Sequence, residues 1–81
     1  MTSIDTEISA TKLSLYPKPT NGQLWFNSKV DAVMVYDNLG NLVLKEKGNN
    51  NELNIDHLGS GVYLIGLWMG DGVVYERVVK L

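Results

Sequence analysis

Few side chains in this sequence could do chemistry, and their spacing does not suit a catalytic site. The single histidine, His57, precedes Leu58 in a short turn, where a histidine is usually solvated rather than a base. No Ser-His-Asp set can be assembled around it, and the chain has no cysteine for a Cys-His pair, a disulfide or a thiolate metal site. No glycine stands at a strand-to-helix junction, as a phosphate-binding loop requires. The sequence therefore predicts no catalytic residue and no cofactor.

The aspartates could in principle bind a cation. A calcium site needs several oxygens that converge, and the aspartates do not follow the spacing of a calcium-binding loop. We expect Asp37 to accept hydrogen bonds from its own hairpin backbone instead. No metal site is predicted, because the aspartates are spread over loops and strand ends. Calcium binding by a single loop is kept as an alternative. The aspartates concerned are Asp31, Asp37, Asp56 and Asp71.

Two tryptophans raise the alternative of carbohydrate binding. Trp25 lies between polar neighbours and is expected to face outward, while Trp68 lies in a strongly apolar segment. Exposed tryptophans can stack on sugar rings. Large aromatic side chains also dominate the burial of small domains, so we expect both tryptophans to cover sheet surface. A carbohydrate-binding module is kept as the alternative function.

The composition indicates one small folded domain with an acidic balance. The 81 residues suffice for one domain, and 44% hydrophobic with 20% charged residues is typical of a folded globule. The net charge of −2 argues against nucleic acid and against a polybasic membrane anchor, since both need clustered Lys and Arg. The sequence shows neither an apolar run of about 20 residues nor a signal peptide. If the protein is exported, we expect its signal in a longer precursor.

Short β-prone runs alternate with turn signals from Lys12 onward. This pattern predicts an all-β domain at residues 12–81, an immunoglobulin-like sandwich of about seven antiparallel strands, behind a flexible linker at residues 1–11. The central strand should be Val62–Met69, which is apolar on both faces, whereas the charges in Val73–Lys80 suit an edge strand. The predicted strands are Lys12–Tyr16, Gln23–Asn27, Val30–Asp37, Asn41–Glu46, Glu52–Ile55, Val62–Met69 and Val73–Lys80.

Turn-forming residues separate these strands. Two prolines and the dipeptide Asn21-Gly22 mark a tight turn, and Gly40 is expected to adopt positive φ in a hairpin. The predicted loops are Pro17–Gly22, Asp37–Asn41, Gly48–Asn51 and a three-residue connection at Gly70–Gly72.

A further spacing points to a sandwich corner. Leu58, Gly61 and Tyr63 have the spacing of a tyrosine corner, in which the phenol hydroxyl bonds to backbone a few residues upstream. An ordinary strand tyrosine after a glycine turn is the alternative interpretation.

Four segments form a longer pattern along the chain: Leu15–Gly22, Val33–Gly40, Leu58–Tyr63 and Glu76–Leu81. Together they resemble the type A C-terminal sorting domain of the type IX secretion system of Bacteroidetes-group bacteria, over about residues 13 to 81. The family usually has Asn between the two prolines, where this chain has Lys18. That difference leaves the turn intact but changes its side-chain capping.

The resemblance implies a folded targeting domain without chemistry of its own. Such domains lie at the C-terminus of exported proteins and take an N-terminal passenger from the periplasm through an outer-membrane translocon. A sortase-like protease then removes the domain at the cell surface, and the passenger is commonly joined to anionic lipopolysaccharide. The implied partners are the passenger, the translocon and shuttle proteins, and the protease, whose cut is expected within or upstream of residues 1–11.

The last strand is the expected recognition element. It ends the chain and offers the charges of Arg77 and Lys80, which we expect to be exposed, together with free backbone groups if it is an edge. The candidate recognition residues are Glu76, Arg77, Val78, Val79, Lys80 and Leu81. Other motif positions are assigned mainly to shape: Pro17, Pro19, Gly22, Asp37, Gly40, Gly61 and Tyr63. A passive fibronectin-like spacer is a third use of the same fold, and fold alone does not separate the three.

Overall fold

The computed structural model describes residues 13–70 and 72–81, so the predicted linker at 1–11 lies outside the described residues. The described chain is all-β, as predicted, with no helix in these two ranges, and therefore none long and apolar enough to span a membrane. Its strands are β1 (Leu15–Tyr16), β2 (Gln23–Tyr36), β3 (Leu42–Asn54), β4 (Gly61–Met69) and β5 (Gly72–Lys80).

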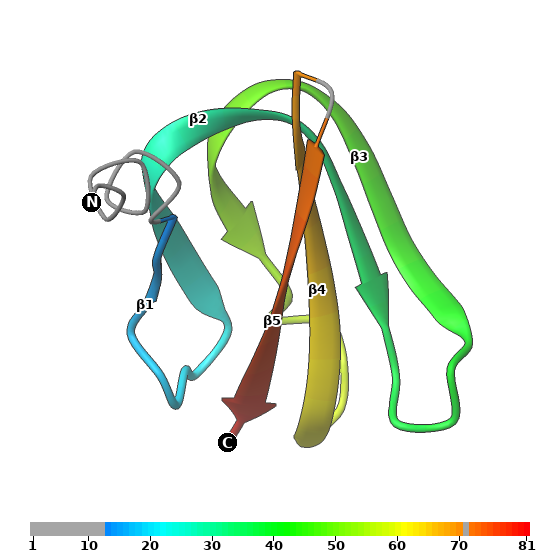
Figure 1. Cartoon of the computed structure of the whole chain (residues 1–81). Helices are drawn as coiled ribbons and strands as arrows, with labels where there is room; N and C mark the ends of the chain where they lie inside the picture. The colour runs from blue at the N-terminus through cyan, green and yellow to red at the C-terminus, as the bar shows by residue number, and fades with distance from the viewer. Residues whose placement is uncertain (1–12, 71) are drawn as a thin grey trace, which may run out of the picture.

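Strand β2 is the spine of the sheet, and all strand pairing is antiparallel (Figure 1). Along one side it pairs with β3 over nearly its whole length. Along the other side its first part pairs with β1 and its last part with β4, which in turn pairs with β5. The prediction that residues 62–69 form a central strand and residues 73–80 an edge strand is confirmed.

The structure has fewer strands than the predicted seven, and all but β1, which covers only Leu15–Tyr16 of the predicted Lys12–Tyr16, are longer than predicted. Strand β2 joins two predicted strands and β3 joins another two, so the loop predicted at Gly48–Asn51 is wrong and those residues lie inside β3. Gly72, predicted in a loop, begins β5 opposite Met69. Register shifts between Trp25 and Ala32 mark an irregularity in the middle of β2, where a bulge bends a strand without ending it.

The bends in β2 and β3 curl the one sheet into two layers that enclose the core (Figure 1). The first layer contains β1, the start of β2 and the end of β3, and the second contains the rest of β2 and β3 with β4 and β5. The layers are halves of one curled sheet, so the immunoglobulin-like relationship stays a prediction. Inward residues of both layers form the core: Leu13, Leu15, Leu24, Phe26, Val30, Val33, Val35, Leu53, Ile55, Tyr63, Ile65, Leu67 and Val78.

Two local predictions at the ends of strands are confirmed. The Tyr63 hydroxyl donates to the Gly59 carbonyl at 2.7 Å, as a tyrosine corner requires. Asp37 Oδ1 accepts the backbone N–H groups of Leu39 and Asn41, both at 2.9 Å, and Gly40 has a φ of 88°. The backbone N–H of Asn41, and secondarily that of Leu39, lowers the pKa of Asp37 below its ordinary value of 3.8.

Candidate recognition site

The end of β5 alternates between the core and the solvent. Val78 and Lys80 point inward, whereas Arg77 and Val79 are exposed. The expectation that Lys80 is exposed is wrong, because it shares the inward face with Val78 and only 8% of its surface is accessible. A lysine tolerates such a position when its aliphatic stem is buried and its ammonium finds an oxygen, and Lys80 Nζ lies 3.4 Å from the Leu81 carbonyl oxygen.

Thr20 ties the loop after β1 to this strand end. Its N–H donates to the Val79 carbonyl at 3.0 Å, and its carbonyl accepts the N–H of Leu81 at 2.9 Å. Its hydroxyl donates to the Gln23 carbonyl and accepts the N–H of Gly22. Thr20 is buried and forms a parallel bridge with Lys80, so two motif segments that are far apart in sequence meet here. Thr20 was not among the predicted functional residues, and its only signal in the sequence is that it is a β-branched polar residue next to Pro19.

Gly22 lets the same loop pack closely against the end of β3. Its φ is 148°, and a Cβ atom there would lie 2.8 Å from the Cα of Asp56. The Gly22 carbonyl accepts the N–H of Ile55 at 2.7 Å. This position therefore requires glycine for both conformation and space. Pro17 and Pro19, which both follow cis peptide bonds, lie in the exposed part of the loop.

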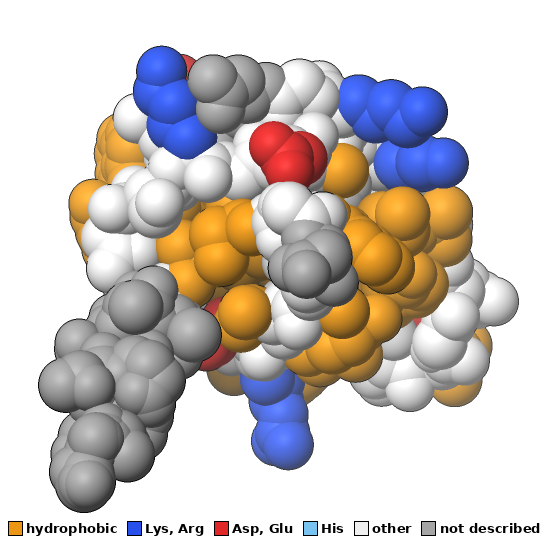
Figure 2. Space-filling model, turned by 45° about the horizontal axis from the view of Figure 1, so that its top comes forward, with side chains coloured by type: hydrophobic (Ala, Val, Ile, Leu, Met, Phe, Trp, Pro, Cys, Tyr) orange, Lys and Arg blue, Asp and Glu red, His pale blue; other side chains and the backbone are white. Residues whose placement is uncertain are grey.

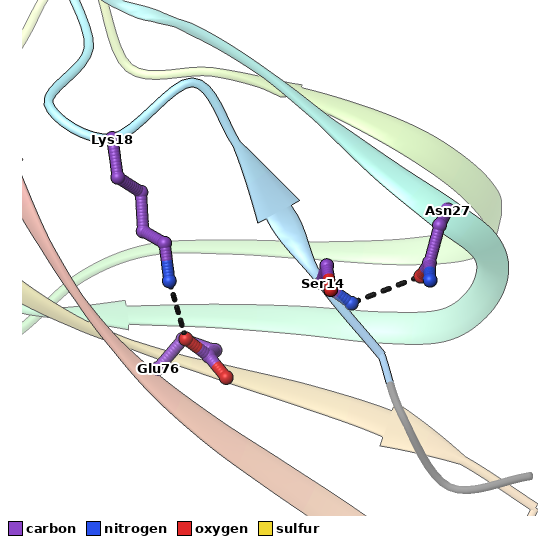
Figure 3. A network of polar contacts seen from close by, with 4 residues as sticks. All are labelled: Ser14, Lys18, Asn27 and Glu76. Atoms are coloured by element: carbon purple, nitrogen blue, oxygen red, sulfur yellow. Dashed lines mark hydrogen bonds and ion pairs between the residues drawn. The ribbon is translucent and has the colours of Figure 1, made fainter. Parts of the chain in front are cut away.

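An ion pair adds a side-chain link between this loop and β5 (Figure 3). Lys18 Nζ lies 2.9 Å from Glu76 Oε1, and both side chains keep substantial contact with solvent. At the other end of β1, the N–H of Ser14 donates to Asn27 Oδ1 on β2. Lys18, which departs from the resembled family pattern, thus has a partner on the candidate recognition strand itself.

The outer edge of β5 is open over most of its length. Alternate residues of an edge strand direct their N–H and C=O groups away from the sheet. On β5 these are Val73, Tyr75, Arg77 and Val79, since the Val79 carbonyl is the one that Thr20 bonds. Among the described residues, no strand pairs with β5 on this side before the Thr20 bridge. β5 thus presents an open edge that is closed only at its end, where Thr20 bridges to Lys80. We call this meeting point of the β1–β2 loop and the end of β5 the Thr20 corner.

Some of the remaining motif residues adjoin the Thr20 corner and others do not. Gly61 pairs with Lys80 and Tyr63 with Val78, so both adjoin it on β4. Asp37 and Gly40 lie in the β2–β3 hairpin, which is separated from β5 by β2 and β4. The structure therefore brings together all of the shape residues except these two.

The other candidate binding residues do not converge. Trp25 and Trp68 are 43% and 36% exposed, and they lie on the outer faces of different layers, so they share no sugar-binding platform. Asp31 accepts a hydrogen bond from the N–H of Gly70, while Asp71 lies outside the described residues. Within residues 13–70 and 72–81, no group of three metal-ligating side chains forms and no pocket is present.

Comparison with known proteins supplies two similarities. A family described as "Secretion system C-terminal sorting domain" matches residues 14–81. The chain is also 30% identical over 80 residues to ulvan lyase NLR42 of Nonlabens ulvanivorans, an alignment that covers 91% of this chain. The chain spans only 15% of the length of that relative.

Proposed function

Because the chain belongs to the family of secretion system C-terminal sorting domains, we propose that it takes an N-terminal passenger from the periplasm through the outer-membrane translocon of a type IX system. On this proposal a sortase-like protease then removes the domain, and the passenger is attached to the cell surface. The family is a sorting signal rather than a catalytic family, so any enzymatic activity is assigned to the passenger.

The observation that supports this proposal most is the match over residues 14–81, which includes every described strand. The geometry is consistent with it, because two of the matching motif segments meet where Thr20 bridges to Lys80. A sorting domain that works with different passengers needs a shape that does not depend on the passenger. The contact between Thr20 and the end of β5 meets this need, because it is held by backbone hydrogen bonds within the domain itself.

We propose further that the machinery reads the end of β5, within Glu76–Leu81. Of these residues, Arg77, Val79 and Leu81 can be contacted without unfolding, since Val78 and Lys80 point inward. The open backbone edge before the Thr20 bridge suits the addition of a partner strand. Val78 and Lys80 are assigned to holding the strand in place.

A secretion reporter tests the sorting function. The full chain is fused to the C-terminus of a reporter that carries a periplasmic signal, in a strain with an active type IX system. We expect the reporter outside the cell, and in the periplasm when the translocon gene is deleted or the domain is omitted. Retention of the complete fusion in the active strain would contradict the proposal.

The role of the last strand is tested in the same strain with Arg77→Gln, which changes an exposed charge without removing a core residue. Lys29→Gln, an exposed lysine in the middle of β2, is the matched control. We expect less secretion of the Arg77 variant only, with equal melting temperatures for the two proteins.

A further inference from the structure

The outer face of the second layer is apolar although it faces solvent. Antiparallel partners lie on the same face of a sheet, so the strand registers define rows of outward residues. One row is Ala32, Trp68 and Val73, the next is Met34, Gly66 and Tyr75, and a third contains Tyr36 and Leu64. We call this surface the apolar outer face; its residues are Ala32, Met34, Tyr36, Val62, Leu64, Gly66, Trp68, Val73, Tyr75 and Val79.

This surface is accessible and continuous. Tyr75 is 51% exposed, and Leu64 and Trp68 are also exposed, while their neighbours Ile65 and Leu67 on β4 point into the core. The ring of Tyr75 lies over Gly66, where a Cβ atom would be 3.0 Å from the ring. Glycine thus lets the Tyr75 ring approach β4 closely at the centre of the face. Figure 2 shows hydrophobic side chains gathered over a wide area of the side that it presents, with Lys and Arg groups at the margins and an acidic side chain next to the hydrophobic area.

The charged side chains that are paired into the rows of the apolar outer face are all basic. Lys47 pairs with Ala32 and Lys45 with Met34, which places both lysines at the β3 end of their rows. Arg77 pairs with Leu64 and stands at the β5 end of the third row. No Asp or Glu occupies a paired position in these rows, although the chain as a whole has a net charge of −2. Three of the seven Lys and Arg residues of this acidic chain thus border the apolar outer face, while the carboxylate of Asp31, next to Ala32, accepts a hydrogen bond from the N–H of Gly70 after β4.

We propose that the apolar outer face is a docking surface for a protein of the secretion machinery whose contact surface is apolar and rimmed by carboxylates. Contiguous exposed apolar surface marks interaction sites, and the basic rim selects an acidic partner surface. The proposal rests on the sorting function above and extends it, because it places recognition on β2, β3 and β4 as well as on the last strand. Trp68 and Tyr75 are the expected anchors, since aromatic residues dominate binding energy at interfaces.

The position of β1 is compatible with a protein of the secretion machinery docked on the apolar outer face. The described chain begins at Leu13, and β1 lies in the other layer, paired with the start of β2 (Figure 1). The described residues that follow a passenger in the proposed precursor therefore begin in the layer opposite the apolar outer face.

Matched substitutions on the two outer faces test the proposal in the secretion reporter. Trp68→Ser removes an anchor, and Trp25→Ser removes the same side chain, with similar exposure, from the opposite face. We expect the first variant to reduce the secreted fraction roughly tenfold and the second to leave it unchanged. Two charge-reversal variants give a second test that leaves the aromatic residues unchanged. Lys45→Glu, at the rim of the face, should reduce secretion, whereas the control Lys29→Glu should not.

The outcomes separate this inference from the sorting function. Normal secretion of the wild type together with all four variants would overturn the docking surface alone. Retention of the wild type would overturn the sorting function and this inference with it. Melting temperatures of the purified fusions check folding; should Trp68→Ser melt early, the lysine pair decides.

Two further measurements test the identity of the occupant. Sedimentation of the purified wild-type chain should show a monomer, and a dimer that Trp68→Ser dissociates would make the occupant a second copy instead. Flotation with vesicles of anionic phospholipid should show no binding. Binding to the vesicles that Trp68→Ser abolishes would make the occupant a membrane surface and overturn the proposal.

Discussion

The two outer faces of the curled sheet are built largely from the same two strands, yet they carry different side chains. On the first layer, β2 and β3 direct polar residues outward, among them Gln23, Glu52 and Asn54, around Trp25 and its exposed partner Tyr16 on β1. On the second layer the outward residues of β2 and β4 are nearly all apolar. Both faces cover the same core, so folding alone does not explain the difference. Apolar side chains that stay in solvent contribute little to folding, and their concentration on one face indicates contact with a partner.

The largest expected effect tests whether the inward and outward sides of the second layer have separate roles. Ile65→Ala should lower the free energy of unfolding by about 2–5 kcal/mol, because it leaves a cavity in the core. Leu64→Ala, one residue away on the exposed side, should cost about 0.5 kcal/mol or less. Urea denaturation of both variants measures the difference. Equal losses would show that Leu64 is needed for folding and would remove the basis of the comparison.

The next effect concerns the backbone contacts on the side of the first layer. Gly22→Ala should cost about 1–3 kcal/mol, since its φ is positive and the added Cβ would meet Asp56. Gly59→Ala is the control, because a Cβ there has no atom within 4 Å. Thermal unfolding should show a clear loss for the first variant only. A stable Gly22 variant would mean that the loop and the end of β3 can separate without cost.

A smaller effect distinguishes two tyrosines on the second layer. Tyr63→Phe should cost about 1 kcal/mol, because it removes the largely buried hydrogen bond to Gly59. Tyr75→Phe should leave stability unchanged, since no described residue bonds to the Tyr75 hydroxyl at the exposed face. Denaturant midpoints of the two variants measure this contrast. A larger loss of stability for Tyr75→Phe than for Tyr63→Phe would contradict the prediction.

The smallest effect lies in the hairpin at the end of β2. The pKa of Asp37 is lowered in the folded state, so the stability that its carboxylate contributes is present above its unfolded pKa, near 3.8. That contribution is lost as the pH falls through the lower, folded value. Asp37→Asn keeps an acceptor oxygen but not the charge, and it should flatten this part of the stability profile. Urea midpoints at about pH 5 and about pH 3 measure the change, and parallel profiles for the two proteins would exclude the effect.

Short-range features were predictable because their atoms are neighbours in sequence. The hairpin at Asp37–Asn41 and the bond from Tyr63 to Gly59 each involve residues at most four positions apart. The spacing of these residues in the sequence is therefore enough to predict the hydrogen bonds that define the two features. The apolar composition of residues 62–69 likewise indicated a central strand before any pairing was known.

Only the tertiary structure decided which residues face the core and which meet across the sheet. One register shift reverses the faces of all residues beyond it, and β2 has several such shifts between Trp25 and Tyr36. Alternation within the sequence therefore could not assign Trp25 and Trp68 to opposite faces. On β5, valines occupy both alternating sets of positions, so the sequence did not show that Lys80 shares the inward side of Val78. The bond between Thr20 and Val79 depends on how two distant segments pack. The sequence determined the local turns and the strand-forming runs, while long-range register determined the faces, because register is set by partners that are distant in the chain.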